Sequence, residues 1–277
     1  MDELLVGQIN VLTISEEKDF GLLLDTEEGR ILLPRREMPG EFEIGESIEV
    51  FVYRDSEDRL IATTIKPLAM VGLFAALIVR EISPIGTFLD WGLQKDLFIP
   101  PRLQLDPLVP GQRVVVKVLL DEVSDRIIAT SKLRSQFDRD VKDLSPGKKV
   151  RTLIYAKAER GWRVVIDDQY QGMIFHNDFF KEPKIGDEIE AFIKKTRPDG
   201  LVDCTLRKGS TTEVKEKAPT ILKMLKDKGG FLPYHDKSDP QLIADVFSMS
   251  KKTFKKSIGA LKKKKIIEIE KDGIRLL

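Results

Sequence analysis

A glycine-led segment that occurs three times constrains the fold of this chain more than any other feature. Each copy begins at a turn and continues as an alternating apolar strand, over residues 44–53, 110–119 and 185–194. A polar turn and a second apolar segment follow every copy, over residues 59–64, 126–131 and 201–206. Repeats of this kind indicate that one structural unit recurs along a chain. The sequence therefore predicts three tandem modules.

Three more strand-like segments precede each repeated segment. The opening ones cover residues 7–14, 71–82 and 150–156. The second and third cover residues 20–25 and 30–34, 86–90 and 96–100, and 162–167 and 172–176. Five short strands per module, separated by Gly, Pro and Asp turns, favour an all-β barrel over β-α-β units. Five strands in a module of this size match the OB-fold, whose second and third strands face oligonucleotides.

The pattern becomes helical after a polar linker at residues 207–216. Ser238 or Asp239 can cap the second of three expected helices, and Ser250 can cap the third. The helices are expected over residues 218–228, 240–246 and 251–264. An Asp-Gly turn then joins two strands, which indicates a β-hairpin at residues 266–277. This order is typical of a winged helix-turn-helix, whose third helix faces nucleic acid.

The expected fold class is therefore mainly β and multidomain. It consists of three tandem five-stranded OB-fold barrels followed by a winged helix-turn-helix domain. The predicted boundaries are residues 1–66 for the first barrel, 67–132 for the second, 145–208 for the third and 216–277 for the winged helix.

Charge is distributed unevenly along the chain. Residues 1–66 hold 7 Lys and Arg against 16 Asp and Glu, a net charge of −9. The net charge is −1 over residues 67–131, +4 over residues 132–210 and +7 over residues 211–277. Because phosphate contacts depend on Lys and Arg, we expect a polyanion to bind the second half of the chain.

The composition also excludes several classes of protein. The longest apolar run, residues 70–79, is too short to span a membrane, and the acidic N-terminus does not resemble a secretory signal. The single cysteine, Cys204, excludes an intrachain disulfide and suits a reducing cytoplasm. With two histidines besides it, a His/Cys metal site is not expected. We therefore expect a cytoplasmic, non-enzymatic protein without cofactor, metal or membrane partner.

Each module resembles the S-one RNA-binding domain, named after the ribosomal protein in which it recurs. That domain has an aromatic-Gly-x-aromatic strand, a Gly-led strand ending near a His, a Gly-Asp turn and a closing Arg-Ile strand. The matching segments here are Phe20-Gly21, Gly86-x-Phe88, Gly172 to His176, Gly186-Asp187 and Arg126 to Ser131.

The aromatic positions of the S-one pattern are incomplete in every module. The first module has Leu23 at the second aromatic position, and the second has Ile85 at the first. In the third module, counting back from its Asp places Trp162 at the first aromatic position. Counting from its Gly instead places Arg160 and Arg163 at the two positions.

The whole chain resembles the bacterial conserved virulence factor B (YitL-like) family, which combines three S-one modules with a winged helix. The tail SMSKKTFKKSIGALKKKKII, residues 248–267, is the most specific part of the resemblance. The resemblance implies RNA binding and post-transcriptional regulation, without known catalysis.

Aromatic side chains on a barrel face can stack on unpaired bases. Phe88 is the best candidate, because it shares a strand face with Asp90 while Leu89 points the opposite way. Trp91 and Phe98 are expected to fill the barrel. Trp162 alternates with apolar residues, which favours burial unless a bulge turns it outward. Binding and packing both stay open for Phe175 and His176, of which strand alternation allows at most one to face outward.

Basic residues accompany these aromatics in the third module and on the expected third helix of the tail. A solvated strand edge is the alternative for the first group, and a contact with the acidic first module is the alternative for the second. The candidate nucleic-acid-binding residues are Phe88, Arg151, Lys157, Arg160, Trp162, Arg163, Phe175, His176, Lys194, Lys195, Lys251, Lys252, Lys255, Lys256 and Lys262.

Three hypotheses follow for the function. The first is an RNA-binding protein that holds single-stranded RNA mainly through the third module and the winged helix. The second is a DNA-binding transcription regulator that uses the winged helix, although its third helix lacks the Arg, Asn and Gln residues that commonly contact base edges. The third is an assembly protein whose acidic first module docks on ribosome or RNA polymerase components.

Overall fold

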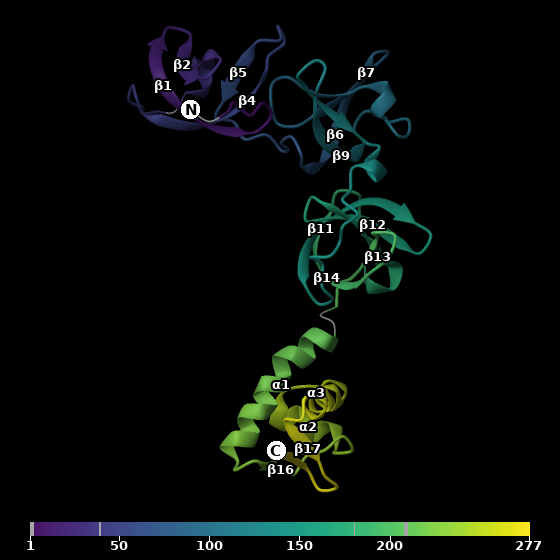
Figure 1. Cartoon of the computed structure of the whole chain (residues 1–277). Coiled ribbons are helices and arrows are strands. Elements are labelled where there is room, and N and C mark those ends of the chain that lie inside the picture. The colour runs from purple at the N-terminus through teal and green to yellow at the C-terminus, as the bar shows by residue number, and fades with distance from the viewer. Residues whose placement is uncertain (1–2, 39, 180, 208–209) are drawn as a thin grey trace. The chain divides into compact units, whose positions relative to one another are not determined.

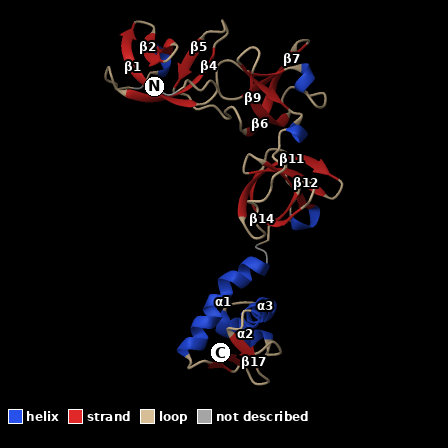
Figure 2. Cartoon of the chain, viewed as in Figure 1, coloured by secondary structure: helices blue, strands red, loops and turns tan. Residues whose placement is uncertain are grey.

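The computed structural model describes residues 3–38, 40–179, 181–207 and 210–277, with the backbone alone for residues 210–216. Strands make up the first three domains, and helices dominate the fourth (Figures 1 and 2). The chain divides into two compact units. One comprises Met1–Val141, Arg151–Ile189 and Arg197–Val202, and the other comprises Lys142–Val150, Glu190–Thr196 and Asp203–Leu277.

The predicted three barrels are confirmed, and all have the same topology. The first contains β1 (Ile9–Lys18), β2 (Gly21–Thr26), β3 (Gly29–Pro34), β4 (Ser47–Arg54) and β5 (Leu60–Thr63). The second contains β6 (Phe74–Ser83), β7 (Gly86–Asp90), β8 (Leu97–Ile99), β9 (Arg113–Asp121) and β10 (Arg126–Thr130). The third contains β11 (Lys149–Ala158), β12 (Gly161–Ile166), β13 (Tyr170–Phe175), β14 (Glu188–Thr196) and β15 (Val202–Thr205). Around each closed barrel the strand order is first, second, third, fifth, fourth.

Each barrel closes with the help of an irregularity at the same point of its first strand. The pairing register shifts between Ile14 and Glu16 in β1, between Val79 and Glu81 in β6, and between Ile154 and Ala156 in β11. A β-bulge bends a strand and increases its twist. The long first strand of each barrel can therefore pair with the second strand on one side and the fourth on the other.

The barrel interiors are filled by alternate residues of the strands. In the first barrel the core contains Leu22, Leu24, Leu33, Val50 and Val52, each at most 1% exposed. Cys204, in β15, is fully buried as predicted.

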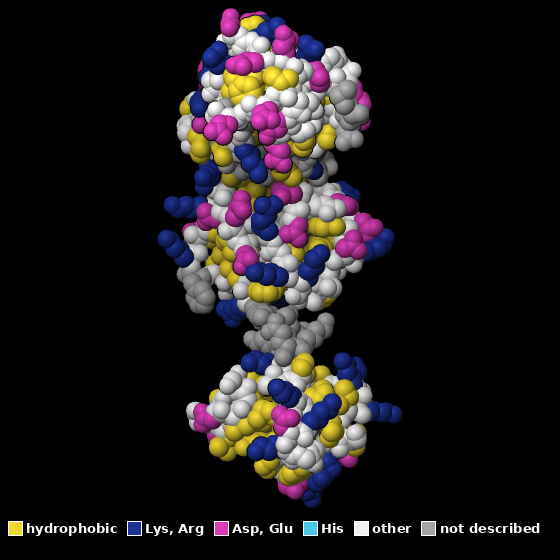
Figure 3. All heavy atoms as spheres, turned by 90° about the vertical axis from the view of Figure 1, so that its left-hand side faces the viewer, with side chains coloured by type: hydrophobic (Ala, Val, Ile, Leu, Met, Phe, Trp, Pro, Cys, Tyr) yellow, Lys and Arg dark blue, Asp and Glu magenta, His cyan; other side chains and the backbone are white. Residues whose placement is uncertain are grey.

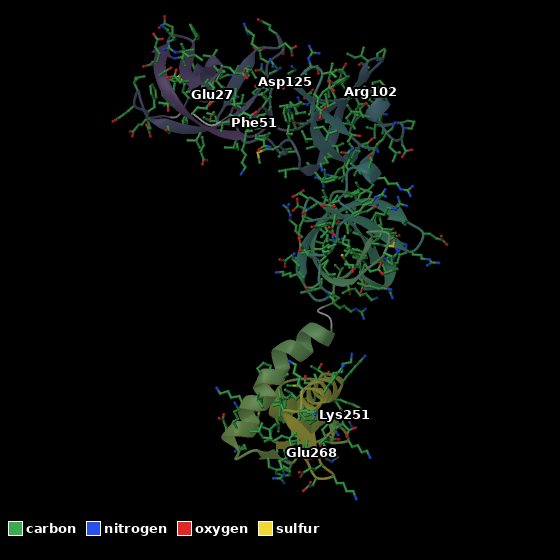
Figure 4. All side chains as sticks on the ribbon, in the orientation of Figure 1. Glu27, Phe51, Arg102, Asp125, Lys251 and Glu268 are labelled. Carbon is green, nitrogen blue, oxygen red and sulfur yellow. The ribbon has the colours of Figure 1, made fainter. Side chains whose placement is uncertain are left out.

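The first two barrels share an apolar junction, which the sequence analysis did not predict. Phe51 and Tyr53 alternate with the core residues of β4, so they point out of the first barrel, yet they are 1% and 5% exposed. They pack into the core cluster of the second barrel, where the Phe51 and Trp91 rings meet edge to face, with centroids 5.7 Å apart. Phe51 and Asp125, labelled in Figure 4, lie in the parts of the two barrels that meet there.

Ion pairs accompany this junction. Arg54 pairs with Asp125 at 2.5 Å, and Arg126 pairs with Asp58 at 2.6 Å. The ammonium of Lys95 donates to the carbonyl oxygens of Arg54 and Asp55, at 3.1 and 2.7 Å. The turn between β4 and β5 is thereby fastened to the second barrel.

The second and third barrels meet through a smaller apolar cluster. Phe74 and Val115 from the second barrel pack with Leu153 and Val165 from the third. The connecting segment adds Leu133, from the short 3-10 helix η3 (Leu133–Ser135), and Phe137, whose ring stacks on Phe74 with centroids 5.1 Å apart.

The predicted winged helix is confirmed in the C-terminal domain. It contains α1 (Ser210–Asp227), α2 (Pro240–Phe247), α3 (Lys251–Lys263), and a sheet of β16 (Phe231–Leu232), β17 (Ile267–Ile269) and β18 (Ile274–Leu276). The side chain of Asp239 caps α2, and that of Ser250 caps α3. Two details differ from the prediction. The first helix begins at Ser210 rather than at residue 218, since Pro219 is accommodated within it, and β16 adds a third strand to the hairpin.

The domain has its own apolar core, formed by all three helices and the sheet. Fully buried members include Ile221 and Leu225 of α1, Ile243 of α2, and Phe254 and Ile258 of α3. Burial of this face of α3 turns its lysines toward solvent. None of the helices described is both long and apolar enough to traverse a lipid bilayer.

Candidate nucleic-acid interface

Three glycines fix which residues are equivalent on the outer faces of the barrels. Gly21, Gly86 and Gly161 each begin the second strand of a barrel. A Cβ atom at any of them would lie 2.1, 2.5 or 2.2 Å from a backbone carbonyl oxygen of the third strand, belonging to Leu33, Ile99 and Ile174 respectively. Only glycine permits so close a backbone approach. Counting from the glycine is therefore the correct alignment of the third module.

The outward position two residues after each glycine differs among the barrels. It holds Leu23 opposite Leu32 in the first barrel, Phe88 opposite Phe98 in the second, and Arg163 opposite Met173 in the third. The equivalent face therefore carries an aliphatic pair in the first barrel, an aromatic pair in the second and an arginine beside a methionine in the third. The second barrel has the two rings that base stacking needs.

Phe88 and Phe98 lie as neighbours on the outside of the second barrel. Both are half-buried, and their ring centroids are 5.2 Å apart. Leu89 is fully buried, so the predicted orientations of Phe88 and Leu89 are confirmed. The expectation that Phe98 fills the barrel is wrong, because its neighbours Leu97 and Ile99 occupy the interior and Phe98 alternates with them. Strand alternation in β8 was the signal that could have found it.

The phenylalanine pair lines a cleft of about 740 Å³ within the first compact unit. Trp91 and Ile85 contribute apolar surface to it, and Ile85 is 67% exposed. Tyr53 and the turn between β4 and β5 line it from the first barrel. Clefts of this volume hold small organic ligands, and the size is sufficient for a nucleobase.

The cations that line this cleft are already engaged by the protein. Arg54 and Arg126 form the ion pairs of the junction, and Lys95 donates to backbone carbonyls. Burial lowers the pKa of Lys95, against the opposing effect of the Asp58 carboxylate. The cleft therefore offers stacking surface rather than free positive charge.

Trp162 stands among the candidate residues, but the structure buries it, as its alternation with apolar residues favours. It is 6% exposed and follows Gly161 as an inward-facing residue of β12, so its indole presents no open face to a base. The ammonium of Lys157 lies 5.6 Å from its ring centroid and pairs with Glu182 at 2.5 Å. Arg151 is also engaged, through an ion pair with Asp168.

The other candidates of the third barrel lie on its surface. Arg160, Arg163, Lys194 and Lys195 are exposed. Phe175 is half-buried, and His176 is exposed with its Nε2 atom 3.2 Å from the carbonyl oxygen of Ala158. The expectation that at most one of these two faces outward does not hold. The strand ends at Phe175, and His176 begins the 3-10 helix η4 (His176–Asp178), where alternation no longer applies.

The predicted basic helix face is present in the winged helix. Lys252, Lys255, Lys256 and Lys262 are exposed on α3, and Lys251 is half-buried at its first position. Lys255 lies 3.4 Å from Asp236. Lys and Arg side chains stand out from this domain in the space-filling view (Figure 3), and Lys251 is labelled at the start of α3 in Figure 4.

Two family models match parts of the chain. Residues 6–65 match an S1 domain, and residues 219–276 match a CvfB-like winged helix domain. These domain types support nucleic-acid binding by the protein.

The chain is similar over its whole length to conserved virulence factor B and YitL, as the sequence predicted. It is 28% identical to uncharacterized protein YitL of Bacillus subtilis, covering 95% of this chain and 90% of YitL. It is 27% identical to conserved virulence factor B of Staphylococcus epidermidis, covering 100% and 96%. A solved structure from Streptococcus pneumoniae, described as a multidomain protein with nucleic acid binding domains, is 24% identical, with a TM-score of 0.44 and 98% of each chain covered.

Proposed function

We propose that this protein binds single-stranded RNA and acts as a post-transcriptional regulator. The observation that carries the binding proposal is the outward Phe88–Phe98 pair in a cleft on the second barrel. Aromatic platforms of this kind stack bases that are not paired, and each stacked base contributes about 1–3 kcal/mol. A duplex keeps its bases stacked on one another, so the cleft favours a single strand.

The charge distribution supports the same proposal. The exposed cations of the third barrel and the lysines of α3 supply the phosphate contacts that the cleft lacks. This assigns stacking to the second barrel, while the third barrel and the winged helix hold the backbone. The resemblance to S-one domains favours RNA over DNA as the strand.

Competition binding tests this proposal on the full chain. Fluorescence anisotropy with a labelled single-stranded RNA is measured against unlabelled RNA, single-stranded DNA and duplex DNA of equal charge at one salt concentration. We expect single-stranded RNA to compete best and duplex DNA worst. Stronger competition by duplex DNA would contradict the proposal and favour a DNA-binding regulator that uses α3.

A further inference from the structure

A groove of about 270 Å³ runs between the second and third barrels, inside the first compact unit. Arg113 of β9 lines it from the second barrel, and Arg134 of η3 lines it from the connecting segment. Tyr155 and Lys157 of β11 and Arg163 of β12 line it from the third. Asp106 is the one carboxylate among the residues that line it.

Three of these cations are not neutralised by an ion pair. Arg113, Arg134 and Arg163 are exposed, and the described part of the chain places no carboxylate within ion-pairing distance of them. Lys157 differs, because it pairs with Glu182. Most of the other arginines in the first two barrels are already bound to carboxylates, as Arg54, Arg59, Arg80 and Arg126 are. The groove thus concentrates positive charge that folding does not neutralise.

The packing of the junction positions the backbone segments that carry Arg113 and Arg134. Arg134 lies between Leu133 and the segment leading to Phe137, both of which pack in the apolar cluster. Arg113 packs against Gly186 of the third barrel. A Cβ atom added to Gly186 would lie 2.6 Å from the Cδ atom of Arg113. Gly186 has a φ of +89°, a conformation that also favours glycine. The motif glycine of the third module therefore makes room for an arginine of the second.

Tyr155 adds a hydrogen-bond donor. Its hydroxyl oxygen accepts from Nε2 of Gln171 at 2.5 Å, and its ring contacts Phe137. Burial raises the pKa of Tyr155, while the hydrogen bonds from Gln171 and Arg163 and the nearby charges of Arg163 and Arg134 oppose that rise. The phenol keeps its proton at neutral pH, so the hydroxyl can donate to an anionic oxygen.

We infer that this groove binds phosphate groups of the nucleic-acid backbone, as a second contact point in addition to the stacking cleft. Guanidinium groups suit phosphate because their planar donors can bind two oxygens at once. In this assignment Arg163 contacts the backbone from the position where the second barrel uses Phe88 to stack a base. This inference rests on the proposed function, and it specifies where the phosphate groups of the bound strand lie.

The test compares two double variants of the full chain with equal loss of charge. Arg134→Gln/Arg163→Gln removes two groove cations, and Arg102→Gln/Lys66→Gln removes two exposed cations that do not line the groove. Affinity for a labelled oligouridylate is measured by anisotropy between 50 and 300 mM KCl. Each phosphate contact on a single strand contributes about 0.7 to the slope of log K against log salt. The groove variant should lose roughly 1.4 from the slope and bind about 25-fold more weakly at 0.1 M salt.

The outcomes separate this inference from the proposed function. If the groove variant behaves like its control while the wild type binds well, the groove assignment is wrong and the proposed function stands. If the wild type fails to bind the oligouridylate, the proposed function is wrong. Inorganic tripolyphosphate serves as a second probe by calorimetry. Tripolyphosphate could bind the wild type but not the groove variant, while the groove variant keeps its normal affinity for the oligouridylate. That result would identify the ligand of the groove as a free polyphosphate and would overturn its assignment to the RNA backbone.

Discussion

Replacement of both Phe88 and Phe98 by alanine should reduce the affinity for single-stranded RNA by roughly 30-fold to several hundred-fold. The two rings form the stacking surface of the cleft, and loss of one or two stacked bases costs about 2–4 kcal/mol in total. The salt dependence of binding should stay unchanged, because no cation is removed. Anisotropy titrations at several salt concentrations measure both quantities.

The first barrel offers a matched control for this variant. Leu23 and Leu32 occupy the equivalent positions and are likewise half-buried. Their double replacement by alanine should leave RNA affinity within about twofold of the wild type, since aliphatic side chains have no π-face for stacking. An equal loss of affinity in both double variants would mean that the effect is structural, and the cleft would lose its assigned role.

Reversal of Lys251, Lys252, Lys255 and Lys256 to glutamate should weaken RNA binding on the order of 100-fold at 0.1 M salt. The slope of log K against log salt should fall by roughly 2–3 if most of these lysines contact phosphates. The domain should stay folded, because the apolar face of α3 is untouched and glutamate in the first turn of a helix interacts favourably with the helix dipole.

The same number of reversals elsewhere in the domain provides the comparison. Lys223, Lys226, Lys228 and Lys237 are exposed but lie outside α3. If these four reversals weaken binding as strongly as those in α3, the domain acts through its net charge rather than through a helix face. An unchanged salt slope in the α3 variant would exclude phosphate contacts by that helix.

The barrel architecture was predictable because its signals are local and repeated. Alternation in the strands, the turn glycines and the spacing between them recur three times, and each is set by backbone geometry. The caps of α2 and α3 were predictable for the same reason, since Asp239 and Ser250 bond to backbone groups in the next turn. The inward position of Trp162 also follows once Gly161 is recognised as the equivalent of Gly86.

The junctions were not predictable from the sequence in the same way. The alternation in β4 indicates that Phe51 and Tyr53 face away from the interior of the first barrel. The sequence of the strand does not indicate that the second barrel buries them. Arg113 and Arg134 come from different elements than Arg163 and are brought together only by the packing of two barrels. The sequence indicated Lys157 and Arg163 as binding residues but not Arg113 and Arg134, because a local sequence pattern contains no information on which domains pack together.

In the proposed binding mode, a single strand stacks in the cleft of the second barrel while later parts of the chain hold its backbone. Photocrosslinking of the full chain to RNA containing 4-thiouridine, followed by mass spectrometry of the crosslinked peptides, tests this most directly. We expect crosslinks at Phe88 or Phe98, together with crosslinks in β11–β12 and in α3. Crosslinks confined to residues 1–66, or absent from the second barrel, would contradict it.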